Sequence, residues 1–550
     1  MTTKYNIVLA QINPTVGDLK NNTKKILNII KNFYLKTDLI IFPELSLVGY
    51  PPEDLILRDK LIDETNICLK KIHNYLEKKN IAVIIGTPMK LNNGIGNAAV
   101  YIKGKTKKAV FKNNLPNYGV FDEKRVFLKG PLYKCINFKS IRIGIMICED
   151  IWTKDIYEKL IKDKADLFIC INASPYDYKK QIQRIEVAKK LVTASKKYLI
   201  YVNQIGGQDE LVFDGGSFVM DPEGEIKYQM DFWKELTNSI ELKFNNKKKI
   251  VLLNKKIKKP YSYYFNIWNA LVLGLKDYVK KNSFKKVVLG LSGGIDSAVS
   301  AAIAVDALGN KNVIGLRLPS KLSSKGSLID AEETIRLLKI DSDTIKINNI
   351  LDQYIKILKN KFENKLLNIT NENLQSRIRG SLLMAYSNNF SYLLLSTGNK
   401  SELSVGYSTI YGDMNGGFNV LKDIYKTDLY KLANWRNKLE KNIFKGSIGR
   451  VIPENSINKE PSAELSLNQK DSDTLPNYNQ LDQILYYFIE REFSIEQICK
   501  RGFPIKTVKK IRSLILLSEY KRRQAPPGVK LSSRAFGKER RYPITNKFKL

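Results

Sequence analysis

Histidine is almost absent from this sequence, and cysteine is scarce. One histidine, His73, occurs among 550 residues, and the five cysteines include no CxxC pair and no cluster typical of disulfides. A Ser-His or Cys-His dyad needs a histidine beside the nucleophile, and structural zinc needs several cysteines or histidines. His73 lies in a polar stretch and is interpreted as a surface residue. We therefore expect no zinc and no haem, and any nucleophile must be activated by carboxylates or lysine.

Long apolar runs are also absent. No segment approaches the roughly 18 consecutive apolar residues that suggest a membrane span. The N-terminal sequence MTTKYNIVLAQINP enters a strand directly, without the charged region and apolar core of a signal peptide. The sequence therefore predicts a cytoplasmic protein with no membrane partner. Its length allows two or three domains.

Acidic residues are too few to balance the basic ones. The chain has 91 lysines and arginines against 55 aspartates and glutamates, a formal net charge of +36. Such a charge would suit nucleic acid or an anionic membrane surface. The lysines are spread along the chain, however, without a long basic block or RNA-type aromatic motifs. A bias towards lysine explains the charge at least as well, and no nucleic-acid partner is expected.

A strand, a glycine turn and a helix are predicted over 287–308, VVLGLSGGIDSAVSAAIAVDAL. Unpaired amides at a helix N-terminus favour an anion, and two glycines let the backbone approach it. A carboxylate beside bound phosphates indicates a bridging Mg²⁺. The turn is neither GxxxxGK[ST] nor GxGxxG. It resembles the pyrophosphate loop of ATP pyrophosphatases, which implies an ATP site formed by Ser292, Gly293, Gly294, Asp296 and Ser297.

The chain divides into two halves. The first half contains short strands that end in polar residues, with helix-like stretches between some of them, and this alternation predicts an α/β layered fold with reactive groups at strand ends. We predict a first domain over 1–237 and a charged, glycine-free connector over 238–262. The second domain, 263–550, carries the phosphate turn.

Three strand ends in the first half present a glutamate, a lysine and a cysteine. Glu44 follows DLIIFP, Lys112 ends KAVFK, and Cys148 follows IRIGIMI. A cysteine at the end of a buried strand is usually a small core residue. In this combination, however, Glu44 can accept the thiol proton, Lys112 can stabilise a thiolate and an oxyanion, and Cys148 can attack a carbonyl.

Residues 4–235 resemble the nitrilase-type amidohydrolases, which use a Glu-Lys-Cys triad. The segments FPELSLVGYPPEDL, KNNLPNYGVFDEKRVF and CEDIW match the subfamily that hydrolyses glutamine. The resemblance implies that Glu123 is a second, supporting glutamate. Glutamine would be held by Tyr118, Glu149 and Ser174, with Tyr50 as a further candidate. A carboxylate beside the nucleophile, such as Glu149, raises a thiol pKa unless it binds a cation, and the glutamine ammonium is a suitable partner.

The segment LSTGNKSELSVGYSTIYGD, residues 395–413, resembles the NAD synthetases. In that family a Thr-Gly-Asn-Lys-Ser-Glu segment helps to bind ATP and Mg²⁺. The resemblance implies that Thr397 contacts ATP and that Glu402 joins Asp296 at the metal. Asp413 would lie near the nicotinate end of deamido-NAD.

Four further segments match the same family: NLQSRIRGSLLMAYSN, DIYKTDLYKLA, KEPSAEL and the basic C-terminal segment that begins near Lys521. The match implies ATP contacts for Lys426 and Ser462, and more loosely for Arg317 in GLRLPSKLSSKGS. The residues implied for deamido-NAD are Asn373, Arg377, Arg379 and Lys521. Because Arg377 and Arg379 are spaced i, i+2 on a helix, they point to different sides. One is expected to bind the dinucleotide and the other to serve an interface.

The sequence thus resembles the glutamine-dependent NAD synthetases across nearly its full length. The resemblance implies an α/β fold, with a nitrilase-like α-β-β-α sandwich followed by a doubly wound parallel-sheet ATP-pyrophosphatase domain. Glutamine, ATP and deamido-NAD would be the substrates, with Mg²⁺ accompanying ATP. Ammonia would travel along an enclosed path, which keeps it nucleophilic. The synthetase domain would form a homodimer or a larger assembly.

Three other functions are compatible with parts of the sequence. GMP or asparagine synthetases share the Ser-Gly-Gly-Ile-Asp-Ser turn but normally pair it with a different glutaminase. A tRNA-modifying ATP pyrophosphatase would suit the positive charge and would bind tRNA with a steep salt dependence. A non-enzymatic binding protein would bind ligands without turnover, although both sets of catalytic residue types are intact.

Overall fold

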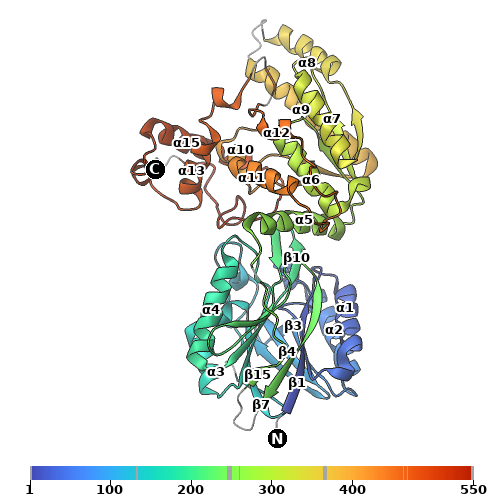
Figure 1. Ribbon diagram of the computed structural model, residues 1–550, viewed down its shortest axis with the longest axis vertical. Coiled ribbons are helices and arrows are strands. Elements are labelled where there is room, and N and C mark those ends of the chain that lie inside the picture. The colour runs from blue at the N-terminus through green and yellow to red at the C-terminus, as the bar shows by residue number, and fades with distance from the viewer. Residues whose placement is uncertain are drawn as a thin grey trace. The chain divides into compact units, whose positions relative to one another are not determined.

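The computed structural model divides into two units, Met1–Tyr261 and Ser262–Leu550 (Figure 1). Each unit has its own sheets and its own hydrophobic core. The structure describes residues 3–131, 134–244, 250–258, 260–362, 368–462, 464–466 and 469–546. No helix among these residues is long and apolar enough to cross a membrane.

The first unit has four layers, with two sheets packed face to face between helices (Figure 1). One sheet has the order β15-β14-β1-β2-β3-β4-β5 and the other β13-β12-β9-β8-β7-β6. The first contains β1 (Thr3–Gln11), β2 (Leu39–Ile41), β3 (Ala82–Leu91), β4 (Gly94–Lys103), β5 (Thr106–Phe111), β14 (Leu236–Phe244) and β15 (Ile250–Leu252). The second contains β6 (Ile136–Phe138), β7 (Ile141–Ile147), β8 (Leu167–Asn172), β9 (Tyr198–Asn203), β12 (Phe218–Met220) and β13 (Ile226–Gln229). A separate hairpin joins β10 (Ile205–Gln208) to β11 (Leu211–Asp214).

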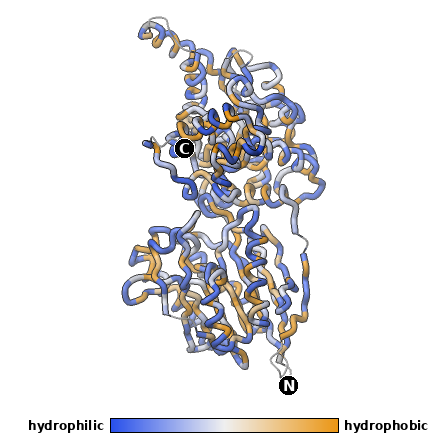
Figure 2. The backbone as a smooth tube through the Cα atoms, turned by 90° about the vertical axis from the view of Figure 1, so that its left-hand side faces the viewer, coloured by the Kyte–Doolittle hydropathy of each residue, from blue (hydrophilic) through white to orange (hydrophobic). Residues whose placement is uncertain are grey.

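The central strands of the first sheet are buried on both faces. In β1, Ile7 and Leu9 belong to the core between the sheets, whereas Val8 and Ala10 pack against helices. This division follows from the pleat, because successive side chains point to opposite faces. Figure 2 shows the resulting hydrophobic stretches along the strands. The helices α1 (Leu19–Phe33) and α2 (Asp59–Leu76) cover the first sheet, and α3 (Lys154–Lys162) and α4 (Lys180–Ser195) the second. The α-β-β-α prediction is confirmed.

The segment predicted as a connector contains two strands of this unit. Strand β14, which begins two residues before this segment, pairs antiparallel with β1 over nine residues, and β15 pairs with β14. The charge of the segment hides its alternation, since Ile240, Leu242 and Phe244 are buried while the residues between them carry the polar groups. Residues 245–249 and 259 of the predicted connector lie outside the described residues.

The second unit is built on a five-stranded parallel sheet in the order β18-β17-β16-β19-β20. The chain proceeds from β16 in one direction and then returns to the other side of β16 at β19. A topological switch therefore lies between β16 and β19, where α/β sheets bind ligands beyond their carboxyl ends. The strands are β16 (Val287–Gly290), β17 (Val313–Arg317), β18 (Asp341–Thr344), β19 (Leu393–Ser396) and β20 (Phe418–Asn419). The doubly wound prediction is confirmed.

Helices surround this sheet and continue beyond it. Helix α6 begins at Ile295, within the phosphate turn, and both α6 and α9 pack on the central strand β16. The C-terminal helices share a separate hydrophobic cluster. The helices are α5 (Tyr263–Lys281), α6 (Ile295–Leu308), α7 (Lys325–Leu338), α8 (Asn348–Lys361), α9 (Asn368–Phe390), α10 (Lys400–Val405), α11 (Lys426–Asn437), α12 (Glu454–Asn458), α13 (Tyr478–Ile489), α14 (Ile495–Cys499), α15 (Ile505–Leu517) and α16 (Glu519–Arg522).

The placement of β14 in the first unit gives a stability prediction. Ile240→Ala should lower the free energy of unfolding of the first unit by about 2–4 kcal/mol, because it leaves a cavity between the two sheets. Ser239→Ala, on the exposed face of the same strand, should change it by less than about 0.5 kcal/mol. Urea denaturation of both variants is the measurement. Equal effects would contradict the assignment of this segment to the core.

Candidate active sites

Glu44, Lys112 and Cys148 meet between the two sheets of the first unit. They follow β2, β5 and β7 respectively, and all three are buried. The Lys112 Nζ lies 2.8 Å from the Glu44 Oε1. Cys148 has a φ of 47° at the start of a short 3-10 helix. Such strained backbone is uncommon for a residue with a side chain and is typical of functional positions.

Glu44 is held by donors on both carboxylate oxygens. Asn97 Nδ2 donates to Oε1 at 2.8 Å, and the backbone amide of Ala173 donates to Oε2 at 2.9 Å. Burial, followed by the Glu44 carboxylate, raises the pKa of the Cys148 thiol, whereas Lys112 lowers it. The resting thiol is therefore protonated and lies close to the Glu44 carboxylate.

Glu123 accepts from the same lysine. Its Oε1 lies 2.8 Å from Lys112 Nζ and accepts from the Tyr50 hydroxyl at 2.9 Å. Its Oε2 is buried and has no hydrogen-bond partner among the described residues. Burial, opposed by Lys112, raises the pKa of Glu123 to about 7. Tyr50 is thus placed behind Glu123 as a hydrogen-bond donor.

Glu149 lies close to Tyr118 and Lys180. Tyr118 is hydrogen-bonded to Glu149, and burial followed by this carboxylate raises the Tyr118 pKa. Lys180 Nζ lies 3.9 Å from Glu149 Oε1 and 4.5 Å from the centre of the Trp152 ring. Ser174 is buried in the loop after β8. Lys180 was not predicted from the sequence, where its only signal is a cation six residues after Ser174 at the start of a helix.

The phosphate turn of the second unit is ordered by its own hydroxyls. Ser297 Oγ lies 3.2 Å from Ser292 Oγ and donates to the Gly294 carbonyl at 3.0 Å. Gly293 has a φ of 83°, and a Cβ there would lie 2.2 Å from the Ser327 carbonyl oxygen, so only glycine fits. The turn lines a cavity of about 300 Å³ beyond the ends of β16 and β19.

Two carboxylates beside this turn share a lysine. Lys426 Nζ lies 2.5 Å from Asp296 Oδ2 and 3.2 Å from Glu402 Oε1, and Asn399 Nδ2 donates to Asp296 Oδ1. Burial, followed by Asp296 and opposed by Lys426, raises the pKa of Glu402 to about 8. Across the described residues no group of three or more His, Cys, Asp or Glu side chains is arranged to hold a metal. Two carboxylates fit Mg²⁺, which usually binds one or two protein carboxylates together with substrate phosphates.

Most of the predicted ATP and dinucleotide residues line the same cavity. Arg379 lies on α9 and donates from Nε to the Leu318 carbonyl, and burial lowers its pKa to about 10. Burial also raises the pKa of Asp413 to about 6. The predicted residues at the cavity are Ser292, Gly294, Asp296, Ser297, Arg317, Arg379, Thr397, Glu402, Asp413, Lys426 and Ser462.

Three predicted dinucleotide residues hold a neighbouring loop instead. Asn373 Oδ1 accepts from Thr409 Oγ1 at 2.9 Å, and Arg377 Nε donates to the Ile410 carbonyl. Lys521 Nζ donates to the carbonyls of Gly406 and Ser408 at 2.8 and 2.7 Å. All three therefore brace the loop that leads from α10 to Asp413. Arg377 is exposed while Arg379 faces the cavity, as their spacing predicted.

The C-terminal segment is ordered against α10. Lys400, at the start of this helix, is fully buried and binds Ser532 Oγ at 2.7 Å, Asp423 at 2.8 Å and Glu490 at 3.1 Å. Arg522 donates to the Ser404 carbonyl at its other end. The sequence did not predict this network, because the partners of Lys400 come from three separate segments of the chain.

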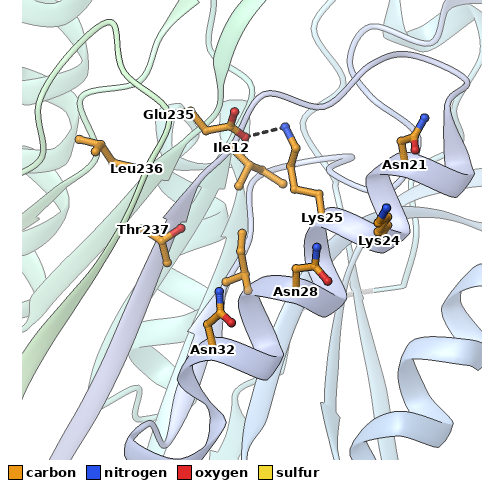
Figure 3. Close-up of a pocket in the computed structure, with 10 residues that line it drawn as sticks. Ile12, Asn21, Lys24, Lys25, Asn28, Asn32, Glu235, Leu236 and Thr237 are labelled. Atoms are coloured by element: carbon orange, nitrogen blue, oxygen red, sulfur yellow. Dashed lines mark hydrogen bonds and ion pairs between the residues drawn. The ribbon is translucent and has the colours of Figure 1, made fainter.

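A surface pocket of the first unit contains none of the predicted site residues. It lies between α1 and the strands β1 and β14 (Figure 3). At its edge, Lys25 Nζ forms an ion pair with Glu235 Oε1 at 2.6 Å. Asparagines and a second lysine, Lys24, make up much of its lining.

Comparison with known proteins matches both units. Residues 6–246 match the carbon-nitrogen hydrolase family and residues 267–525 the NAD synthase family. Glutamine-dependent NAD(+) synthetases of Aquifex aeolicus and Thermotoga maritima are 42% and 40% identical, each over 99% of both chains. The solved structure of such a synthetase from Acinetobacter baumannii, in complex with adenosine diphosphate, is 39% identical over 98% of both chains, with a TM-score of 0.77. This chain belongs to the glutamine-dependent NAD⁺ synthetases.

Proposed function

We propose that the first unit hydrolyses glutamine and that the second uses the released ammonia to convert deamido-NAD⁺ into NAD⁺. The overall reaction consumes glutamine and ATP and yields glutamate, AMP and pyrophosphate. The observation that carries the proposal is the buried Lys112 ammonium between Glu44 and Glu123, beside a cysteine at a strained strand end. The proposal also includes three further points: Mg²⁺ accompanies ATP, the protein is cytoplasmic, and it assembles through the synthetase unit.

In the first unit, Glu44 accepts the Cys148 proton as the sulfur attacks the glutamine carboxamide carbon. Lys112 donates to the oxyanion that develops on the carboxamide oxygen. Glu44 then returns the proton to the leaving nitrogen. Ammonia departs, and the acyl group remains bound to Cys148 as a thioester. Water, deprotonated by Glu44, hydrolyses the thioester to glutamate and restores the Cys148 thiol.

The ends of glutamine are recognised by opposite charges. Glu149, with the Tyr118 hydroxyl, binds the α-ammonium group, and Lys180 binds the α-carboxylate. Ser174 completes the pocket beside them. These contacts select an amino acid and leave its side-chain amide directed at Cys148.

In the second unit, the turn at Ser292–Ser297 binds the phosphates that leave as pyrophosphate. Asp296 and Glu402 would hold Mg²⁺, which supplies neutralisation of phosphate charge. Lys426 then exchanges its contact with one of the two carboxylates for a hydrogen bond to a phosphate oxygen. The nicotinate carboxylate of deamido-NAD⁺ attacks the α-phosphorus and forms an acyl-adenylate. Ammonia attacks the acyl carbon, AMP leaves, and the amide of NAD⁺ remains.

Removal of the nucleophile should separate the two reactions. Cys148→Ala should lower glutamine-driven NAD⁺ formation by about 10³-fold or more, because no thioester can form. Ammonium-driven formation should continue. Cys170→Ala removes a second buried thiol and should keep both activities. NAD⁺ and AMP are measured with each nitrogen donor, and full glutamine-driven activity in Cys148→Ala would contradict the proposal.

Lys426 should act in the second reaction alone. Lys426→Ala should lower ammonium-driven synthesis by about 10²-fold or more, since a charge-assisted contact to the phosphates is lost and two carboxylates remain unbalanced. Glutamine hydrolysis by the first unit should persist. Lys431→Ala, on the same helix but 60% exposed, is the matched control and should lie within twofold of wild type. Similar losses in both variants would argue against a phosphate contact.

Glu123 should make the stability of the first unit depend on pH. Because burial raises its pKa from the ordinary 4.5 to about 7, the folded unit retains a proton in this range that the unfolded chain has lost. The contribution of Glu123 to stability therefore falls as the pH rises from about 4.5 to 7 and is constant above. The unfolding free energy of wild type minus that of Glu123→Gln should decrease from pH 5 to pH 8. An increase, measured by denaturation at both pH values, would refute the assignment.

A further inference from the structure

Arg184 and Asp214 form a buried ion pair directly behind the loop that carries Ser174. Arg184 belongs to α4 and Asp214 ends β11. Arg184 Nη1 donates to both Asp214 oxygens, at 2.7 and 3.0 Å, and the two side chains are 4% and 2% exposed. Neither residue belongs to the triad or to the charged pair around Glu149.

Every nitrogen of the Arg184 guanidinium has an acceptor. Besides the two contacts to Asp214, Nε donates to Ser174 Oγ at 3.0 Å. Nη2 donates to the carbonyls of Ser174 and Pro175, at 2.7 and 3.0 Å. A guanidinium presents its N–H donors in a rigid plane, and all three nitrogens are engaged here. The donors of Arg184 therefore serve Asp214 and the Ser174 loop.

These hydrogen bonds restrict the conformation of Ser174. Its hydroxyl oxygen accepts from Arg184, so its hydroxyl proton must point elsewhere, and its carbonyl accepts from Arg184 and from Asn203 Nδ2. Its backbone amide donates to Asn203 Oδ1 at 3.0 Å. Both the main chain and the side chain of Ser174 are thus fixed before any ligand binds, which lowers the entropic cost of binding.

We propose that Arg184, oriented by Asp214, is the positioning residue that fixes Ser174 and thereby sets the affinity of the first unit for glutamine. This inference rests on the proposed glutamine hydrolysis. Because Arg184 donates to the Ser174 loop and not to Glu44, Lys112 or Cys148, its loss raises the KM for glutamine more than it lowers kcat.

A purely structural ion pair would behave differently. Replacing one partner leaves a buried charge unpaired, whereas replacing both with apolar residues of similar volume is often neutral for stability. The double variant Arg184→Met/Asp214→Leu therefore separates the two roles. It removes both charges together, and it also removes the donor to Ser174 Oγ.

The experiment measures NAD⁺ formation by the full chain at saturating ATP and deamido-NAD⁺, with either glutamine or ammonium varied. In Arg184→Met/Asp214→Leu the KM for glutamine should rise at least tenfold, with kcat within threefold of wild type and the ammonium-driven rate unchanged. Arg184→Lys should show a similar rise, because lysine keeps the charge but lacks the planar fork. Adding Ser174→Ala to the double variant should raise the KM no further, since the residues act as one unit.

A KM within twofold of wild type in the double variant would overturn the inference. If that variant does not fold, Arg184→Lys decides by the same criterion. A parallel fall of glutamine-driven and ammonium-driven rates would also overturn it, because that pattern indicates general destabilisation. A wild-type chain that uses ammonium but no glutamine would overturn the proposed function, and this inference with it.

Discussion

Both active sites depend on a buried lysine placed between two carboxylates. Lys112 lies between Glu44 and Glu123, and Lys426 between Asp296 and Glu402. Two buried carboxylates cannot both ionise in a poorly solvated site unless a cation offsets their repulsion and desolvation. Removing either lysine leaves uncompensated charge. In a chain with one histidine, lysine is the cation that offsets these buried carboxylates.

The same arrangement supports the C-terminal segment. Lys400 is fully buried and is bound by Asp423 and Glu490, and its third partner, Ser532, comes from the end of the chain. Helix α10 is thereby held by the basic C-terminal segment of the chain. Because α10 also carries Glu402, this carboxylate and the C-terminal segment are parts of one packed unit.

Sheet topology explains why these groups meet. Glu44, Lys112 and Cys148 follow strands of two facing sheets, so the sandwich brings together residues that are far apart in sequence. In the second unit the Ser292 and Thr397 turns follow β16 and β19, between which the strand order reverses. Parallel strands present their carboxyl ends at one edge, and the connections diverge there and leave space for a ligand.

The sequence by itself determined the α/β class, the two units, the phosphate turn and the three strand-end residues of the first unit. These features are local, because strand periodicity, a glycine turn and a polar residue at a strand end can each be recognised within about ten residues. The charged segment around Ile240 was misleading, since its alternation is masked by lysines and asparagines. Only pairing with β1 identifies it as part of the sheet.

Tertiary structure alone decided which side chains share a charge or a hydrogen bond. Lys180 near Glu149, Arg184 on Ser174 and Lys400 on Ser532 join residues on separate elements. Tertiary structure also decided that Asn373, Arg377 and Lys521 brace one loop while Arg379 faces the cavity. Such partners have no fixed spacing in sequence. They pair because the fold brings them close together in space and because buried charged or polar groups need hydrogen-bond partners.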